Sequence, residues 1–493
     1  MARKKQSKRP QRSNRYQRRG GDRQKNQTIF KALLAWLLPE DELFAEDRFH
    51  GNIKWKPEQL AQQALIWAWQ DTRNVTDAFA QAVEVCEELG IDRGSKTYTA
   101  FMNALDRYRG ILSRRLRLRF QEVAEEVGGR FWRDNDWVLM GFDGSRVTAP
   151  RTVSNETALC APNYGKSQSA KYRKRKTKGM RRRKNEKNKP QPQGPQAWIT
   201  MMWHMRLRLP WTWRLGPSSS SERGHVVEIL EQEEFPKNTL FCGDAGFVGY
   251  PLWSAILKAG GDFLIRVGGN VSLLSETADV KDAGDGRVLC WPKDEMHSGA
   301  PPLHLRLVRI RIGKTTMWML TSVLDRKKLR IKELVRYYKM RWGVEVEYRG
   351  LKQTNDKCKL RCRNSDRLYV ELDWSIRAMA MAELMALCEQ IPKKKERRSN
   401  DTSTYDTKDR SLANTMRALR KCMRNLNKDV DSSNDLLYQL SRALVQKYNN
   451  HTDKKARYRP QNKDKKPLGE PTVRKLNGKE RERLNKFNRQ VAA

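Results

Sequence analysis

The order of apolar segments between residues 137 and 267 limits the possible folds of this chain more than any other feature. Short apolar runs typical of strands lie at 138–142, 197–205, 207–215, 239–243 and 263–267. Helical patterns lie between them at 225–234 and 251–258. The order is therefore strand, strand, strand, helix, strand, helix, strand. It predicts an α/β domain, in which helices pack against a mixed sheet.

A second group of strand patterns follows. Residues 268–302 are rich in glycine, residues 303–312 alternate strictly between apolar and charged side chains, and residues 315–323 have the pattern of another strand. We interpret 268–323 as a β-rich insertion in the α/β domain. From residue 325 the periodicity becomes helical and stays so to about residue 352.

Helical patterns dominate residues 28–128, which we expect to form a helical DNA-binding domain. Apolar side chains recur at three- and four-residue spacing up to residue 69, and Pro57 suits the first turn of that helix. A second helix is expected to end at Gly90, and Ser95 could cap a third. That third pattern leads into a basic string, Arg114, Arg115, Arg117 and Arg119. The string predicts either a helix-turn-helix-like grip on a DNA groove or a solvated basic face.

A further helical region is expected at 356–450. Patterns with one apolar face lie at 378–390 and 412–426. Such faces need a partner surface. These helices are expected either to pack on the α/β domain or to mediate pairing of two protomers.

The charge balance points to a polyanionic partner. The chain has 99 Lys and Arg against 57 Asp and Glu, a formal net charge of +42. A nucleic-acid backbone is the usual partner for such an excess, because each neutralised phosphate releases a counterion. A ribosomal or chromatin-like basic protein and a merely solvated surface are the alternatives. Composition by itself says nothing about catalysis.

Four segments are too poor in large apolar residues to offset the entropy of ordering the chain, so we expect them to be disordered. They are 1–27, 170–196, 392–408 and 451–493. The first is a basic arm and the last a basic tail. The stretch 171–189 is almost all Lys, Arg, Asn and Gly, which is typical of a phosphate-gripping arm or of a solvated linker.

The spacing of the cysteines and the sequence of the N-terminal segment indicate in which cellular compartment the protein is expected. None of the eight cysteines forms a Cys-x2-Cys pair, so no zinc ribbon is expected. Reduced thiols in a cytoplasmic, nucleoid-associated protein fit this spacing best. Residues 1–27 contain no apolar core of a signal peptide, and the run at 32–38 is too short to span a membrane.

Three carboxylates are prominent because of where they lie. Asp143 and Asp244 each follow an apolar strand run, and Glu345 lies on the expected basic helix. An acid at the end of a strand in an α/β sheet lies where ligands usually bind. An Asp followed by glycine, as at Asp143, is also an ordinary turn residue. Taken one at a time, each of these acids could be either a ligand-binding residue or an ordinary turn residue.

The helix brings four polar side chains onto one face. At 100° per residue, Tyr338, Arg341, Glu345 and Lys352 point in directions of about 0°, −60°, −20° and −40°. A narrow face of long polar side chains suits a phosphate site better than a core stripe. Glu347 points about 180° from Tyr338, which makes it the weaker candidate.

Three further features of this helix leave alternatives open. Gly343 in mid-helix costs about 1 kcal/mol relative to alanine, so a close neighbour is expected there, either backbone or DNA. Arg341 and Glu345 are four residues apart, so an exposed helix with internal ion pairs would explain the same spacing. Trp342 is either a core residue or a wedge for a flipped base.

The string Tyr338-x2-Arg341-x3-Glu345-x6-Lys352 resembles the Y-x2-R-x3-E-x6-K motif of a large group of bacterial insertion-sequence transposases of the DDE class. Phe142-Asp143-Gly144-Ser145 and Gly243-Asp244-Ala245-Gly246-Phe247 resemble that group's first and second aspartate motifs. The similarity covers residues 137–354. It implies a ribonuclease H-like catalytic domain at 129–355, with the β-rich insertion between the second Asp and the Glu. The basic stretch at 170–196 is longer than this pattern leads us to expect.

The resemblance implies a DNA transposase that cuts transposon ends and joins the freed 3′-hydroxyl to target DNA, in cut-and-paste transposition. The carboxylates of Asp143, Asp244 and Glu345 can together hold two Mg²⁺ about 3.5–4 Å apart, and Mn²⁺ is an expected substitute. Arg341 and Lys352 are expected to offset phosphate charge.

Tyr338 is expected to stack on the DNA or to hydrogen-bond to it near the cut. The partners implied are transposon ends and target DNA, with a homodimer on the DNA and no membrane. Two other classes remain open. One is a basic DNA-binding protein without catalysis, including a decayed transposase. The other is a nuclease or junction resolvase on the same fold.

Overall fold

The computed structural model describes two compact units of the chain. The described residues are 24–40, 42–53, 55–92, 97–160, 194–277, 280–313, 315–391, 405–445 and 468–492. One unit combines Met1–Val127 with Trp374–Val445, and the other combines Gly128–Asp373 with Gln446–Ala493.

The first unit is built from helices. They are α1 (Asn26–Leu37), α2 (Pro57–Trp69), α3 (Val75–Leu89), α4 (Tyr98–Arg107), α5 (Arg109–Gly128), α14 (Ser365–Gln390), the short 3₁₀ turn η5 (Thr407–Asp409), α15 (Leu412–Met423) and α16 (Leu436–Ser441). Two short strands, β1 (Gln24–Lys25) and β11 (Asp429–Val430), pair antiparallel. Helices α5 and α14 each run on into the second unit.

Local signals in the sequence set several of these helix ends. Pro57 occupies the first turn of α2, where its missing N–H costs nothing. Asn74 caps α3, and Gly90 ends it with a left-handed φ of 66°. Thr97 caps α4 by accepting a hydrogen bond from the Ala100 N–H. Ser95, the cap expected from the sequence, lies outside the described residues.

The C-terminal helices pack against the N-terminal ones. Trp69 of α2 donates its indole N–H to the carbonyl of Ala378 in α14, at 2.8 Å. The Asn26 N–H at the start of α1 donates to the Lys428 carbonyl at 3.1 Å. Helix α1 also contacts α15 and α16. The apolar faces of the C-terminal helices are thus covered by N-terminal helices, which differs from both expected roles. Periodicity predicts that a face is buried but does not identify its partner.

The basic string in α5 is partly used inside this unit. Arg115 and Arg114 both bond to Asp47, with Nε to Oδ2 at 2.5 Å and Nη2 to Oδ1 at 2.6 Å. Arg119 donates to the Trp36 carbonyl at 2.8 Å. Three of the four arginines therefore fix α5 to the segments around α1, which explains their charge without nucleic acid.

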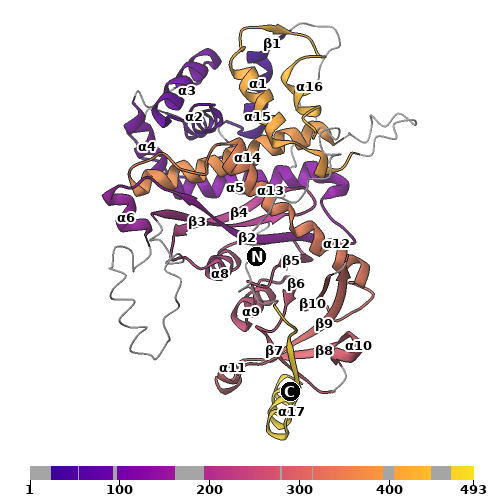
Figure 1. The fold of residues 1–493 in the computed structure, drawn as a ribbon. Coiled ribbons are helices and arrows are strands. Elements are labelled where there is room, and N and C mark those ends of the chain that lie inside the picture. The colour runs from indigo at the N-terminus through magenta and orange to yellow at the C-terminus, as the bar shows by residue number, and fades with distance from the viewer. Residues whose placement is uncertain are drawn as a thin grey trace, which may run out of the picture. The chain divides into compact units, whose positions relative to one another are not determined.

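The second unit is built on a ten-stranded mixed sheet (Figure 1). Its strands are β2 (Val138–Thr148), β3 (Gln196–His204), β4 (Leu209–Pro217), β5 (Thr239–Gly243), β6 (Asp262–Val267), β7 (Ser272–Ser275), β8 (Asp285–Cys290), β9 (Leu303–Ile312), β10 (Thr315–Thr321) and β12 (Thr472–Lys475). The spatial order is β12-β7-β8-β9-β10-β6-β5-β2-β3-β4.

The strand order confirms the expected fold class. Strands β2, β5 and β6 run parallel, whereas β3 and β4 continue from β2 as an antiparallel meander. This is the mixed sheet expected from the order of elements, in the ribonuclease H-like arrangement that the family resemblance implies. The β-rich insertion supplies β7 to β10, and β10 pairs antiparallel with β6, so the insertion extends the same sheet.

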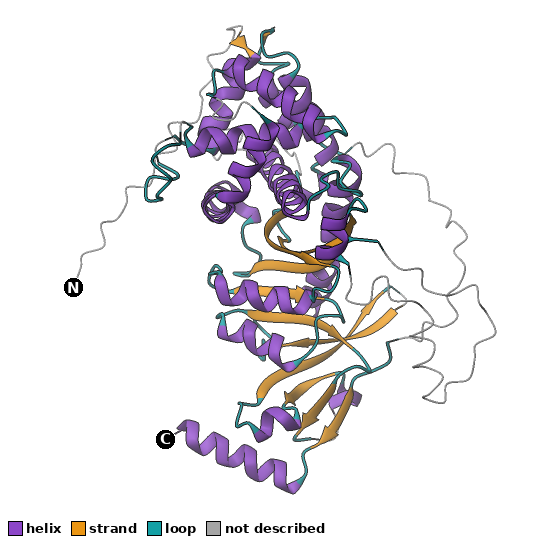
Figure 2. Ribbon diagram, turned by 90° about the vertical axis from the view of Figure 1, so that its left-hand side faces the viewer, coloured by secondary structure: helices purple, strands orange, loops and turns teal. Residues whose placement is uncertain are grey.

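Helices cover both faces of this sheet. They are η2 (Gly129–Phe131), α6 (Val153–Leu159), α8 (Glu222–Gln232), α9 (Tyr250–Lys258), α10 (Val280–Ala283), α11 (Lys293–His297), α12 (Ile331–Arg341), α13 (Gly343–Arg349) and the π-helix η4 (Gly350–Thr354). Figure 2 shows α8 and α9 side by side along the strands.

Two glycines on β2 show that α8 and α12 lie on opposite faces. A Cβ atom on Gly141 would lie 3.7 Å from Arg341 of α12, and one on Gly144 would overlap Glu222 of α8. Residues three apart on a strand point to opposite faces. Arg341 and Glu222 therefore approach β2 from opposite sides of the sheet.

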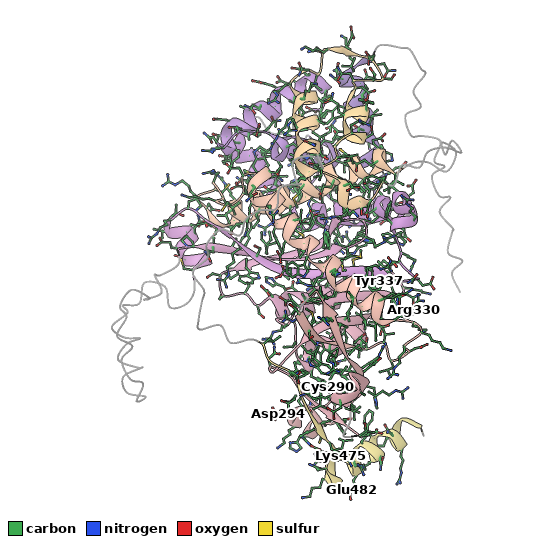
Figure 3. All side chains as sticks on the ribbon, turned by 45° about the vertical axis from the view of Figure 1, so that its right-hand side comes forward. Cys290, Asp294, Arg330, Tyr337, Lys475 and Glu482 are labelled. Atoms are coloured by element: carbon green, nitrogen blue, oxygen red, sulfur yellow. The ribbon has the colours of Figure 1, made fainter. Side chains whose placement is uncertain are left out.

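The expected disorder of residues 451–493 is wrong for its described part. Strand β12 adds parallel to β7, and α17 (Gly478–Ala492) follows it. Leu476 and Leu484 are buried against Leu274, Leu289 and Trp291 of the insertion. Figure 3 shows Lys475 of β12 and Glu482 of α17 near Cys290 of β8. The few apolar residues of this tail suffice because the insertion supplies the rest of the core.

The other segments expected to be disordered lie mostly outside the described residues. This holds for 1–23, 170–193, 392–404 and 446–467. None of the described helices is long and apolar enough to cross a membrane.

Candidate active site

The two aspartates lie side by side on neighbouring parallel strands. The pairing of β2 with β5 sets Gly141 opposite Cys242. Two residues further along each strand, the same register places Asp143 opposite Asp244. Neighbouring strands are separated by about 4.8 Å, so these carboxylates share one edge of the site.

The sheet forms a notch at this point. Strand β5 ends at Gly243, whereas β2 continues to Thr148; it stays paired with β3 on its other side and forms a bridge to Lys359 at Thr148. The Asp244 carboxylate accepts a hydrogen bond from the Gly246 N–H at 2.8 Å, which holds the turn after β5. An open edge beyond the carboxyl end of a parallel strand is where α/β proteins usually bind ligands.

The helix that carries Glu345 is fastened to the sheet over this notch. A Cβ atom on Gly343 would overlap the buried ring of Trp203 on β3, so only glycine allows the helix to come this close. The close neighbour expected at Gly343 is therefore a side chain. Tyr348 donates its hydroxyl to the Asp143 carbonyl at 2.8 Å. It lies three residues after Glu345, on the same side of α13.

The helix is less regular than the single α-helix expected. It consists of α12, a break at Trp342, α13, and the π-helix η4, which carries Lys352. π-Helical turns are rare and are frequent at functional sites. The irregularity rotates Lys352 relative to an ideal helix, and its ammonium donates to the Ser145 hydroxyl at 2.7 Å. Lys352 is thus joined to the first aspartate motif.

The four side chains of the expected polar face have different environments. Tyr338 and Arg341 are buried, Lys352 is half-buried and Glu345 is exposed. The Arg341 guanidinium lies over the Tyr338 ring, 5.5 Å from its centroid. No ion pair joins Arg341 to Glu345 in the described part of the chain, so the internal ion pair is not the reason for their spacing. Glu347 is buried, away from Glu345.

The charges of the three acids act on one another. Burial is the main cause that raises the pKa of Asp143 to about 6, and the charges of Asp244 and Glu345 act in the same direction. The Gly144 N–H and the Arg341 charge oppose the rise. Burial also lowers the pKa of Lys352. A carboxylate whose pKa is raised by neighbouring acids lies at a place that a cation would stabilise.

Oxygen donors of this kind suit a hard divalent cation such as Mg²⁺. Within the described ranges, however, no group of three or more His, Cys, Asp or Glu side chains is close enough to hold a metal ion as it stands. The donor set therefore fits a divalent cation in its chemistry, but its members are not arranged around one as they stand.

The sequence interpretation missed Glu222. This residue starts α8, and its carboxylate lies against Gly144, next to Asp143. Burial raises the pKa of Glu222, and the charges of Asp143 and Asp244 raise it further. The expected helix began at residue 225, which left Glu222 in a loop. Ser221, whose hydroxyl caps α8, was the available signal.

Trp342 does not belong to the core. Its side chain is 58% exposed although it is flanked by the buried Arg341 and Val344. Val346, four residues later, is also exposed. An exposed tryptophan beside a carboxylate site is typical of a contact surface for a ligand.

The fold and the carboxylates at the notch define a ribonuclease H-like α/β protein with an acidic site at the end of its parallel strands. Residues 143–381 match the family model described as the transposase DDE domain. This part of the chain is therefore a DDE transposase domain, and the chain is a DNA-cleaving and strand-transferring enzyme. Members of this class use divalent metal ions.

The other comparisons add little. No curated protein matches the chain. Among solved structures, a piggyBac transposase synaptic complex with hairpin DNA is similar at 12% identity and a TM-score of 0.35. That match covers 80% of this chain and 84% of the other. The family match, not this structural similarity, carries the assignment.

Proposed function

We propose that Asp143, Asp244 and Glu345 hold two Mg²⁺ ions in this transposase, with Mn²⁺ as a substitute. The observation that supports the proposal is that β2, which contains Asp143, pairs parallel with β5, which ends one residue before Asp244, while α13 with Glu345 packs on β2. When bound, the ions would activate the attacking oxygen and stabilise the leaving oxygen of a phosphodiester. The π-helix η4 immediately after α13 is where a small shift could bring Glu345 towards the aspartates.

The chain's own cations would position the scissile DNA. Arg341 is buried beside Asp143, and its Nε has no hydrogen-bond partner among the described residues. A buried guanidinium with an open donor suits a phosphate oxygen. Lys352 would reach a neighbouring phosphate from its place beside Ser145, to whose hydroxyl its ammonium donates.

Tyr338 and Trp342 would contact the nucleotide near the cut. The Tyr338 ring supports the Arg341 guanidinium, so we assign it the role of orienting that cation as well as touching DNA. Trp342 is exposed next to Glu345's helix and is free to stack on an unpaired base.

The partners proposed are transposon ends and target DNA, with a homodimer bringing two ends together. The net charge of +42 supports DNA binding and a place at the nucleoid. The route proposed is cut-and-paste, in which the freed 3′-hydroxyl attacks the target.

Isosteric substitution tests the catalytic assignment. Asp143→Asn, Asp244→Asn and Glu345→Gln are each expected to abolish Mg²⁺-dependent cleavage of an end-containing duplex, with DNA affinity unchanged in a mobility-shift assay. Glu231→Gln, an exposed acid on α8, is the matched control and should cleave normally. A wild-type cleavage rate in any of the three variants would remove that residue from the site.

The products of the reaction separate the two rival functions. A joined product, in which the 3′ end is linked to target DNA, is expected from the wild-type protein. Hydrolysis without any joining would favour a nuclease or resolvase. DNA binding with no cleavage in either Mg²⁺ or Mn²⁺ would favour a non-catalytic DNA-binding protein.

A further inference from the structure

Glu371 carries a charge in the interior of the second unit. It lies near the start of α14, in the part of that helix that belongs to this unit, and its exposed fraction is 0%. Burial opposes ionisation, yet the charge of Lys357 and the hydrogen bonds to the carboxylate hold the pKa of Glu371 below its ordinary value. A buried carboxylate is unfavourable unless donors surround it, so the segments that supply those donors are held in fixed positions around it.

One carboxylate oxygen holds the end of the π-helix η4. Oε1 accepts a hydrogen bond from the Lys357 ammonium at 2.9 Å, and the Lys357 side chain is only 17% exposed. The backbone N–H of Lys357 donates to the Leu351 carbonyl of η4 at 3.1 Å. Lys352 is the next residue of that helix, and its ammonium donates to Ser145. The position of Lys352 therefore depends on a residue whose side chain is fixed by Glu371.

The other oxygen holds the segment that pairs with the end of β2. Oε2 accepts hydrogen bonds from the N–H groups of Arg361 and Cys362, both at 2.9 Å. Immediately before them, the Leu360 N–H donates to the Thr148 carbonyl at 2.8 Å, and the Thr148 N–H donates to the Cys358 carbonyl at 3.0 Å. Strand β3 pairs with the opposite edge of β2, so this segment lies on the same edge as β5, beyond the point where β5 ends.

We propose that Glu371 is a positioning residue for DNA cleavage, which fixes the π-helix that carries Lys352 relative to the strand that carries Asp143. One side chain holds both elements, through one oxygen each. The inference rests on the proposed function, because it assumes that Lys352 and Asp143 act on the scissile DNA. Lys352 stays beside Ser145 as long as the two elements keep this spacing. Glu371 itself is buried and would touch neither the DNA nor a metal ion.

Glu371→Gln is the isosteric test. The amide has one accepting oxygen, and its NH2 group must face either the Lys357 ammonium or the N–H groups of Arg361 and Cys362. One of the two connections is therefore lost, while the volume of the side chain is kept. We expect the cleavage rate at saturating end-containing duplex to fall by about tenfold to a hundredfold. The DNA concentration that gives half of the maximal rate should stay unchanged. A wild-type cleavage rate in this variant would overturn the inference.

A second comparison tests whether Glu371 acts through Lys352. In a Lys352→Met background the ammonium is gone, so Glu371→Gln should slow cleavage much less than it does in the wild type. Equal slowing in both backgrounds would show that Glu371 acts elsewhere and that the inference is wrong. If Lys352→Met is slow and Glu371→Gln is not, the inference alone fails. If Lys352→Met itself cleaves at the wild-type rate, the proposed role of Lys352 fails, and the role of Glu371 fails with it.

Two substitutions at Lys357 leave the buried carboxylate in place, and they decide the question if Glu371→Gln does not fold. Lys357→Arg keeps a cation that can donate to Glu371, so it should cleave close to the wild-type rate. Lys357→Met has no donor and should be slowed in the same way as Glu371→Gln. Equal rates in the two Lys357 variants would contradict the connection from Glu371 to η4 and would overturn the inference.

Asp285→Asn is the control for a loss of stability. Asp285 accepts two hydrogen bonds from Arg306, both at 2.8 Å, in the same unit, and the Arg306 side chain is buried. In the sheet, four strands lie between β8, which carries Asp285, and β2. Asp285→Asn should lower the melting temperature yet leave the cleavage rate unchanged at a temperature where the protein is folded. Equal slowing of cleavage in Asp285→Asn and Glu371→Gln would indicate a general loss of stability and would overturn the inference.

Discussion

Gly343 determines how closely the helix of Glu345 approaches the sheet. In an exposed helix, Gly→Ala stabilises by about 1 kcal/mol. Here the added methyl group would overlap the buried Trp203 ring, and overpacking of this kind costs about 1–3 kcal/mol. We predict that Gly343→Ala lowers the denaturant midpoint of the second unit and slows cleavage by displacing Glu345.

The matched control is Gly110→Ala, in α5, where a Cβ atom meets nothing within 4 Å. That variant should be as stable as the wild type or more so. In the double variant Gly343→Ala, Trp203→Phe, the smaller ring should restore part of the lost stability. Wild-type stability and cleavage in Gly343→Ala would show that the contact with Trp203 does not position this helix.

His204 makes the stability of the second unit depend on pH. It is fully buried between Trp132 and Trp211, and its Nδ1 accepts the Leu207 N–H at 3.1 Å. Burial is the main cause that lowers its pKa from 6.5 to about 3. Below pH 6.5 the unfolded chain binds a proton that the folded chain does not. Stability is therefore lost as the pH falls from 6.5 towards 3, by about 1.4 kcal/mol per pH unit.

The test compares denaturant midpoints at pH 7.5 and pH 5. In His204→Asn, whose amide oxygen can still accept the Leu207 N–H, the midpoint should be lower at pH 7.5 but should fall less towards pH 5. His297→Asn, at an exposed histidine that ends α11, should keep the wild-type dependence. An unchanged pH dependence in His204→Asn would contradict this account.

At the scale of elements, local patterns predicted the sheet but not every contact within it. The strand runs ending at Asp143 and Asp244 were identifiable because buried parallel strands are apolar on both faces. The insertion followed from the alternation at 303–312, which β9 confirms. Asp143 lies in β2, Asp244 follows the neighbouring β5, and the helix of Glu345 packs on β2, while their joint role stays a prediction.

What could not be predicted depends on contacts between segments far apart in sequence. Glu222 reaches Gly144 across 78 residues, a relation that no periodicity records (222 − 144 = 78). Lys352 lies in a π-helix, so it departs from the 100° per residue that was assumed when the four polar side chains were placed on one helical face. Trp342 is exposed because the break in the helix falls at that residue.

The C-terminal strand and helix were not predicted either, because the residues that bury them lie far away in the sequence. β12 continues the sheet of the insertion, and Leu484 of α17 is buried in a small cluster with Leu289 and Trp291. Leu→Ala in a packed cluster costs about 2–5 kcal/mol. We predict that Leu484→Ala releases β12 and α17, seen as faster amide hydrogen exchange in β12 and β7 and no change in β2.

Asn485→Ala, at the exposed neighbouring position, is the control and should leave exchange unchanged. Equal protection of β12 in wild type and Leu484→Ala would mean that the strand pairing holds the tail without the cluster. The cleavage rate should be the same in both variants, because neither residue is near the notch.

At the scale of the whole molecule, the net charge of +42 is the feature that most affects how the protein meets DNA. Charge of this size speeds association and makes affinity strongly dependent on salt. Three arginines of α5 are engaged in contacts within the chain, so that helix accounts for less of the binding than its composition indicates. The basic stretch 171–189 is the main candidate for the remainder.

The two interpretations of that stretch make opposite predictions about salt. A phosphate-gripping arm releases counterions, and each phosphate contact contributes about −0.9 to the slope of log K against log salt concentration. We predict that replacing 171–189 by a Gly/Ser sequence of equal length makes this slope less negative, by about 0.9 for each phosphate contact that is lost. The slope is measured by fluorescence anisotropy from 50 to 300 mM NaCl. Replacing 454–466, a shorter and less charged basic stretch of the C-terminal tail, gives a control in which the change of slope is compared per positive charge removed. An unchanged slope after the first replacement would identify 171–189 as a solvated linker. In that case the basic arm 1–27, the basic tail and the surface around the notch are the remaining candidates, and Arg341 and Lys352 are the first described residues to test.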